Sequence, residues 1–181
     1  MNKYFLIVLL FMIFSSCLRA SEEARFNYGA ELDALPYLTG GYYLSGWIGK
    51  EKLRVRGVVA SVNLPEFVVK SGFKDNSLNA YALIVDYFPK PDFSGTWYGG
   101  GFEIWESKIK SESDNMAATY SNLVVTAGGG YVWNFHKYFY LNPWVAVHGI
   151  VGGDETVNVG TKVFEPTKVT GEISLKIGFK Y

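Results

Sequence analysis

Few side chains in this sequence have the types and spacing that catalysis requires. Nucleophilic catalysis needs a nucleophile, a base and an orienting group within hydrogen-bond reach of one another. The chain has two histidines that could act as the base, His136 and His148. A distant serine such as Ser121 is an available nucleophile, but no local motif joins it to either histidine. We therefore expect no catalytic residue.

The sequence also has few motifs that could bind a metal ion or a cofactor. Glu112 and Asp114 lie close together, as do Asp154 and Glu155, and these carboxylates could bind a divalent cation. They are also typical of solvated loop charges. The sequence contains no Asp-rich calcium loop, phosphate-binding loop or zinc-ligand cluster. We expect neither a metal ion nor a cofactor.

The charged residues instead alternate with apolar ones, most clearly at the end of the chain. From Ile173 onward, every second residue is apolar and the others are polar, charged or glycine, which is the period of a β-strand. The apolar face contains Ile173, Leu175, Ile177, Phe179 and Tyr181. The opposite face contains Glu172, Ser174, Lys176, Gly178 and Lys180. The sequence predicts a terminal strand with one face for lipid and one for a polar interior.

Seven earlier segments have strand-like patterns, and no helical periodicity competes over a useful length. The expected strands are 27–35, 41–48, 52–63, 78–88, 97–108, 120–135 and 138–151. Gly57 could mark a β-bulge in the third strand. The connections after the second, fourth and sixth strands are short to moderate, whereas 65–77, 109–119 and 152–169 are longer and more polar; 35–40 is a short exception. Such sorting of turns and loops is typical of transmembrane β-barrels.

The beginning of the chain has the layout of a secretory signal peptide. Lys3 precedes an unbroken apolar run from Tyr4 to Phe14, which is too short to span a bilayer. We expect cleavage after Ala20, which divides the chain into a signal peptide, residues 1–20, and a barrel domain, residues 21–181. The alternative is cleavage before Cys17 with a lipid attached to that cysteine.

Composition limits the remaining choices. The chain has 17 basic and 17 acidic residues, and no basic patch suggests nucleic acid. Cys17 is the only cysteine and lies in the leader, so a mature chain cut after Ala20 has neither disulfides nor thiol catalysis. Aromatic residues make up 17% of the chain, and there are 20 glycines. Both values are ordinary for a barrel with aromatic girdles.

Together these features resemble the small eight-stranded outer-membrane barrel proteins of Gram-negative bacteria, the OmpA-domain and OmpX-like class. The resemblance covers residues 25–181 and rests on the leader, the eight amphipathic strands, the loop asymmetry and the alternating end. It implies an all-β fold, an eight-stranded antiparallel up-and-down transmembrane β-barrel. It also implies that Leu175, Ile177, Phe179 and Tyr181 form the signal read by the barrel-assembly machinery. We find no appended peptidoglycan-binding domain, so the resemblance does not imply anchoring to the cell wall.

The position of Lys176 predicts which face is inside. At a strand tilt near 40°, it lies roughly 12 Å above the membrane edge, close to the middle of an apolar band about 25 Å tall. A lysine facing lipid there costs about 2–4 kcal/mol. We expect a lumen filled by paired charges, without an open pore. The expected lumen residues are Arg54, Arg56, Asp86, Glu103, His148, Glu172 and Lys176.

The resemblance also defines the expected location, partners and alternative functions. We expect a monomer in the bacterial outer membrane with a structural or surface-interaction role, or, in the alternative, a lipid anchor through Cys17. Expected partners are outer-membrane lipid, lipopolysaccharide and the barrel-assembly machinery, and not nucleic acid. Some barrels of this class modify lipid A, but the deacylases carry a serine two residues after the histidine, where this chain has Ile150.

A barrel that binds an apolar ligand in its lumen is the other alternative. The segment from Ser94 to Tyr98 looks like the Gly-x-Trp start of a lipocalin, although too few residues follow it for that fold. We interpret the match as chance and expect Trp97 and Tyr98 in an aromatic girdle at the membrane interface.

Overall fold

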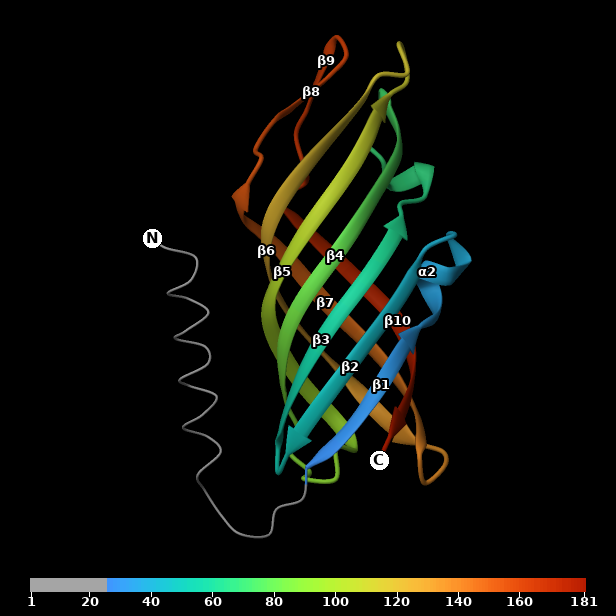
Figure 1. Cartoon of the computed structure of the whole chain (residues 1–181), viewed down its shortest axis with the longest axis vertical. Coiled ribbons are helices and arrows are strands. Elements are labelled where there is room, and N and C mark those ends of the chain that lie inside the picture. Colours follow the sequence, from blue (N-terminus) through green and yellow to red (C-terminus); the bar gives the residue numbers. More distant parts are fainter. Residues whose placement is uncertain (1–25) are drawn as a thin grey trace.

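Eight antiparallel strands close into a barrel in the computed structural model, which describes residues 26–181 (Figure 1). The expected signal peptide, Cys17 and both cleavage sites lie outside the described residues. Around the ring the strands follow the order β1-β10-β7-β6-β5-β4-β3-β2. Their bounds are β1 Asn27–Asp33, β2 Tyr42–Lys50, β3 Leu53–Asn63, β4 Phe73–Tyr87, β5 Gly95–Ser111, β6 Ala117–Asn134, β7 Phe139–Gly153 and β10 Val169–Lys180. The predicted up-and-down barrel is confirmed.

The terminal strand closes the ring, as its alternating pattern predicted. β10 pairs with β1 on one side and with β7 on the other. Beyond the strand, the Tyr181 N–H donates to the Tyr28 carbonyl oxygen at 2.8 Å, and the Tyr28 N–H donates back to Tyr181 at 3.2 Å. The last residue of the chain is therefore fastened to the first strand.

The described part of the chain contains four short elements that the sequence did not predict. A helix of five residues, α2 (Ala34–Leu38), joins β1 to β2, and a 3-10 helix, η1 (Glu66–Val68), lies between β3 and β4. β8 (Val157–Val159) and β9 (Lys162–Phe164) form a hairpin within the connection from β7 to β10. No helix within residues 26–181 has the length and apolar character needed to cross a membrane.

Two predicted details of the strands were wrong. Gly57 forms no bulge, because β3 keeps a continuous register with both of its neighbours. The irregularity falls instead between Lys74 and Ser77 in β4, where Asp75 has a positive φ of 49°. That break in alternation hid the first five residues of β4, so the strand begins at Phe73 and not at Leu78.

The strands differ greatly in length, and the rim of the barrel is therefore uneven. β1 has 7 residues and β2 has 9, whereas β5 has 17 and β6 has 18. The upper ends of β5 and β6 form a tip that also includes the β8–β9 hairpin (Figure 1). An apolar cluster of Ile109, Tyr120, Val159 and Phe164 packs inside this tip.

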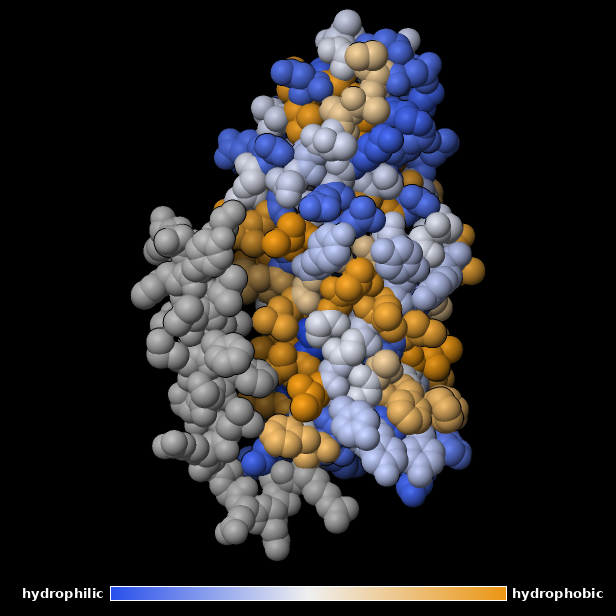
Figure 2. All heavy atoms as spheres, viewed as in Figure 1, coloured by the Kyte–Doolittle hydropathy of each residue, from blue (hydrophilic) through white to orange (hydrophobic). Residues whose placement is uncertain are grey.

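The outer surface of the barrel carries an apolar band. Outward-facing side chains on five of the strands include Leu44, Val59, Leu83, Phe102 and Val145, each at least 42% exposed. Figure 2 shows hydrophobic residues along the middle of the molecule and hydrophilic ones gathered toward the tip. Such exposure is unusual for a protein surrounded by water and typical of a wall that faces lipid.

Candidate functional site in the barrel lumen

The lumen is closed at its lower end by an apolar floor. Trp47, Phe88, Phe93, Trp97 and Tyr140 are each at most 5% exposed and form one cluster with Val132. The prediction that Trp97 belongs to an interface girdle was wrong, since its indole N–H donates to the Asn142 side-chain oxygen inside the barrel at 2.8 Å. Its neighbour Tyr98 faces outward and is 61% exposed.

Above this floor lies a cluster of four charges. Arg54 and Asp86 occupy paired positions on β3 and β4, and the guanidinium Nε lies 2.8 Å from the carboxylate. Arg56 donates two further hydrogen bonds to Asp86, both 3.1 Å long. Glu31 lies 3.2 Å from Arg54 and 3.7 Å from Arg56. All four side chains are at most 3% exposed. Each charge therefore depends on the others for compensation.

Neutral donors complete the coordination of Glu31. The Tyr140 hydroxyl donates to this carboxylate at 2.9 Å, and the Asn142 amide donates at 3.0 Å. The Arg54 guanidinium also lies over the Phe88 ring, 4.9 Å from its centroid. Strands on different sides of the lumen are thus joined by hydrogen bonds and by cation–π contact.

Lys176 lies inside the barrel, but not in the ion pair that we expected. Among the described residues its ammonium has no hydrogen-bond acceptor. The Nζ atom lies 3.7 Å from the centroid of the Trp144 ring. The Trp144 N–H donates to Asp33 at 3.2 Å, and the Ser174 hydroxyl donates to the same carboxylate. The indole therefore stands between a cation on its face and an anion at its edge, an arrangement that favours both contacts.

A third group surrounds His148 higher in the lumen. Its Nδ1 lies 3.2 Å from Glu103 and its Nε2 lies 3.2 Å from Glu172, although the Nδ1 contact is not aligned as a hydrogen bond. Glu103 also accepts a hydrogen bond of 2.6 Å from the Trp105 indole. An imidazole placed between two carboxylates suits a bridging cation, because a general base needs a free nitrogen directed at a substrate.

The other positions considered for catalysis do not approach His148. Ser121 is exposed on the outer face of β6, on the opposite side of the wall from this imidazole. The backbone of Ile150, in the position where lipid A deacylases carry serine, donates to the Lys168 carbonyl oxygen. His136 lies in the turn between β6 and β7, at the end of the barrel opposite the tip. These placements give no support to a nucleophile–histidine pair.

The structure divides the sequence-predicted lumen residues between two clusters. Arg54, Arg56 and Asp86 lie together, as do His148, Glu103 and Glu172, while Lys176 lies among aromatic rings. Glu31 and Asp33 were not among the predicted lumen residues, although both fall on one face of the first strand and the cost of a charge in lipid applies to them as well. The neutral partners Tyr140, Asn142 and Trp144 were also not predicted, because they carry no charge that would require a place inside the barrel.

The acidic loop residues mostly bind backbone groups. Asp114 accepts hydrogen bonds from the N–H groups of Met116 and Thr161, and these donors lower the pKa of its carboxyl group. Asp154 accepts from the Ser121 N–H at 2.9 Å. Within residues 26–181, no group of three or more histidine, cysteine or acidic residues is arranged to hold a metal ion.

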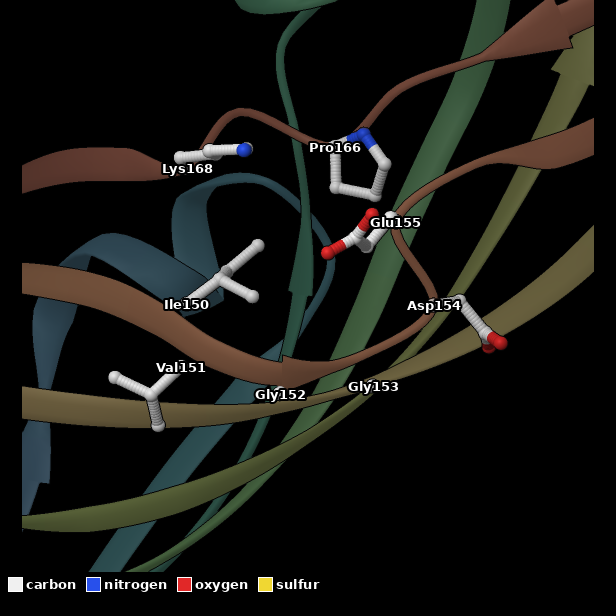
Figure 3. Close-up of a pocket in the computed structure, with 8 residues that line it drawn as sticks. All are labelled: Ile150, Val151, Gly152, Gly153, Asp154, Glu155, Pro166 and Lys168. Atoms are coloured by element: carbon white, nitrogen blue, oxygen red, sulfur yellow. The ribbon is translucent and has the colours of Figure 1, made fainter.

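A small pocket of about 160 Å³ lies near Asp154, where β7 leads into the long connection to β10 (Figure 3). Its lining is formed by Ile150, Val151, Gly152, Gly153, Asp154, Glu155, Pro166 and Lys168. A larger hollow of about 440 Å³ lies on the outer wall, between residues of β3 and β6. Neither is a closed chamber in the lumen of the kind that an enclosed apolar ligand needs.

Comparison with known proteins identifies the fold. No protein-family model matches the sequence, and no curated protein matches it significantly. The structure is similar to the crystal structure of Neisserial surface protein A (NspA), with a TM-score of 0.54 and 13% sequence identity over 88% of this chain and 100% of that one. It is also similar to a major outer membrane protein from Thermus thermophilus, with a TM-score of 0.50, 14% identity and the same coverage. The chain has the fold of small outer-membrane barrels.

Proposed function

We propose that this protein is a monomeric outer-membrane β-barrel whose lumen does not conduct and whose tip interacts with partners at the cell surface. The observation that carries the proposal is the inverted polarity of the wall. Side chains such as Leu83 and Phe102 face outward, while charged side chains such as Arg54 and Asp86 are buried inside. A water-soluble domain has the opposite arrangement. A closed barrel in a bilayer has this one.

The contents of the lumen support a sealed structural role. The aromatic floor lies across the lower end, and the cluster of Glu31, Arg54, Arg56 and Asp86 fills the space above it. An eight-stranded barrel is just wide enough for side chains to fill. Ions would have to displace buried ion pairs to pass, so the barrel acts as a rigid support and not as a channel.

The length and packing of the tip support a role at the cell surface. A transmembrane strand needs only about 9–11 residues to cross a bilayer. β5 has 17 residues and β6 has 18, so both extend well beyond the membrane. The loops above are tied together: the Lys70 ammonium donates to the Glu165 carbonyl oxygen at 2.6 Å, and the Lys162 ammonium donates to the Gly72 carbonyl oxygen at 3.3 Å. A packed projection of this kind presents a fixed surface to a partner.

Three measurements test the membrane location and the sealed lumen. The folded protein should resist SDS until it is heated, so boiled and unboiled samples should migrate differently on a gel, and the protein should fractionate with outer membranes. Recovery in the soluble periplasm would contradict the location. Reconstituted protein should give no stepwise conductance in planar bilayers, and steady single-channel currents would contradict the sealed lumen.

A further inference from the structure

We infer that α2 (Ala34–Leu38) lies in the outer boundary of the membrane, with its exposed side chains in contact with lipid; this inference rests on the proposed membrane location. The connection that contains α2 differs in charge from the others. Residues 34–49 include no charged side chain. The other connections at this end of the barrel all carry charges, among them Glu66, Glu112 and Lys168.

The length of β1 places α2 at membrane height. β1 has 7 residues. It is therefore shorter than the roughly 9–11 residues that a transmembrane strand needs. At about 3.3 Å per residue and a tilt near 40°, it rises about 18 Å, whereas the apolar band is about 25 Å tall. α2 follows β1 directly, so it lies within the upper part of the apolar band that β1 is too short to cross. In Figure 1, α2 lies well below the β8–β9 hairpin along the long axis, and below the unlabelled η1 between β3 and β4.

The side chains of α2 extend the apolar band without interruption. Leu38 is 80% exposed, and Leu35 and Tyr37 are 46% and 49% exposed. Leu32 on β1 and Leu44 on β2, which lead into and out of this connection, face outward and are 49% and 52% exposed. In water this apolar surface would be unfavourable, and in the outer leaflet it completes the contact with lipid on the short side of the barrel.

Several polar groups of α2 have partners within the protein, which favours a location in lipid. Asp33, buried in the lumen, accepts a hydrogen bond from the Leu35 N–H at 3.1 Å and caps the helix. Pro36 has no N–H to satisfy. Its carbonyl oxygen accepts from the Gly41 N–H at 2.8 Å. The Tyr37 hydroxyl donates to a carbonyl oxygen of β2 at 3.1 Å. These bonds reduce the cost of placing a non-strand segment at the apolar boundary.

Spin labels at three positions test this placement. In a Cys17→Ser background, nitroxide is attached separately to Leu38→Cys, Leu175→Cys and Phe67→Cys in protein folded into phospholipid vesicles. Leu175 on β10 is the reference for the lipid-facing wall, and Phe67 on η1, 87% exposed beside Glu66, is the reference for water. Collision rates with oxygen, which dissolves in lipid, and with a polar nickel complex report the depth of each label.

We expect the label at position 38 to collide with the nickel complex roughly tenfold less than the label at position 67, because polar solutes are excluded from hydrocarbon. Its depth should be shallower than that at position 175. Equal nickel accessibility at positions 38 and 67, with position 175 still shielded, would overturn the placement of α2 and leave the membrane proposal intact. Nickel accessibility at position 175 as well would overturn both.

Discussion

The substitution Asp86→Asn tests how much the four-charge cluster of Glu31, Arg54, Arg56 and Asp86 contributes to the free energy of unfolding. This change keeps the shape of the side chain and removes its charge, leaving Arg54 and Arg56 with Glu31 as their one charged partner. Asp86 receives three of the cluster's hydrogen bonds, 2.8 to 3.1 Å long, and is fully buried. Loss of one member of a buried ion pair costs about 3–5 kcal/mol. We expect the free energy of unfolding to fall by about that amount.

The assay is urea unfolding of vesicle-embedded protein, followed by the difference in gel migration between folded and unfolded forms. The matched control is Asp75→Asn, which breaks an ion pair of similar length, 2.8 Å, between Asp75 and Lys110 at the exposed tip. An exposed pair contributes about 0–1 kcal/mol. The double variant Arg54→Met with Asp86→Asn restores one cation to one anion and should recover part of the loss. Equal small losses for Asp86→Asn and Asp75→Asn would refute the view that the lumen charges depend on one another.

Three further predictions concern other parts of the barrel. Among the described residues, the buried Lys176 ammonium has no acceptor. Because such a charge is costly, Lys176→Met should leave the free energy of unfolding within about 1 kcal/mol or raise it, and a loss above about 3 kcal/mol in the urea assay would contradict this. Tyr181→Ala should lower the yield of folded protein in cells far more than in vesicles if the terminal strand is an assembly signal, and equal losses in both would point to lost packing against Tyr28. The pKa of Asp114 is lowered by its hydrogen bonds. Those bonds therefore contribute stability above the ordinary aspartate pKa of about 3.9 and lose it as the pH falls through the lower folded value. The Thr161 amide resonance should shift below about pH 4 in the native protein. An identical shift in Asp114→Asn would exclude this carboxylate as the cause.

The sequence predicted the strands and their faces where alternation was clean. The period of two from Ile173 to Tyr181 identified the terminal strand, and the cost of a charge in lipid placed Lys176 inside. The same reasoning failed for Trp97, because aromatic residues suit both a lipid interface and a packed lumen, and a single strand does not show which face its tryptophan takes.

Other features depend on contacts between strands that the sequence does not display. The pairing of Glu31 with Arg54 joins β1 to β3, which are separated by β2 and do not pair with each other, so neither position predicts the other. Lys176 contacts the Trp144 ring in place of a carboxylate, although Asp33 is its register partner on β1. α2 was missed because a helix of five residues is too short to show a helical period, so the segment 35–40 was interpreted as a short connection.

The short first strand also determines how the chain can fold. Seven of the eight pairings in the ring join barrel strands that are consecutive along the chain, so each of these pairs can form from residues close in sequence. The pairing of β1 with β10 joins the two ends of the chain, and it holds along few positions because β1 is short. Distant pairings form slowly, and elements with few backbone bonds open most easily. We therefore expect the sheet to close into a barrel in the last step of folding, and the pairing between β1 and β10 to open first on unfolding.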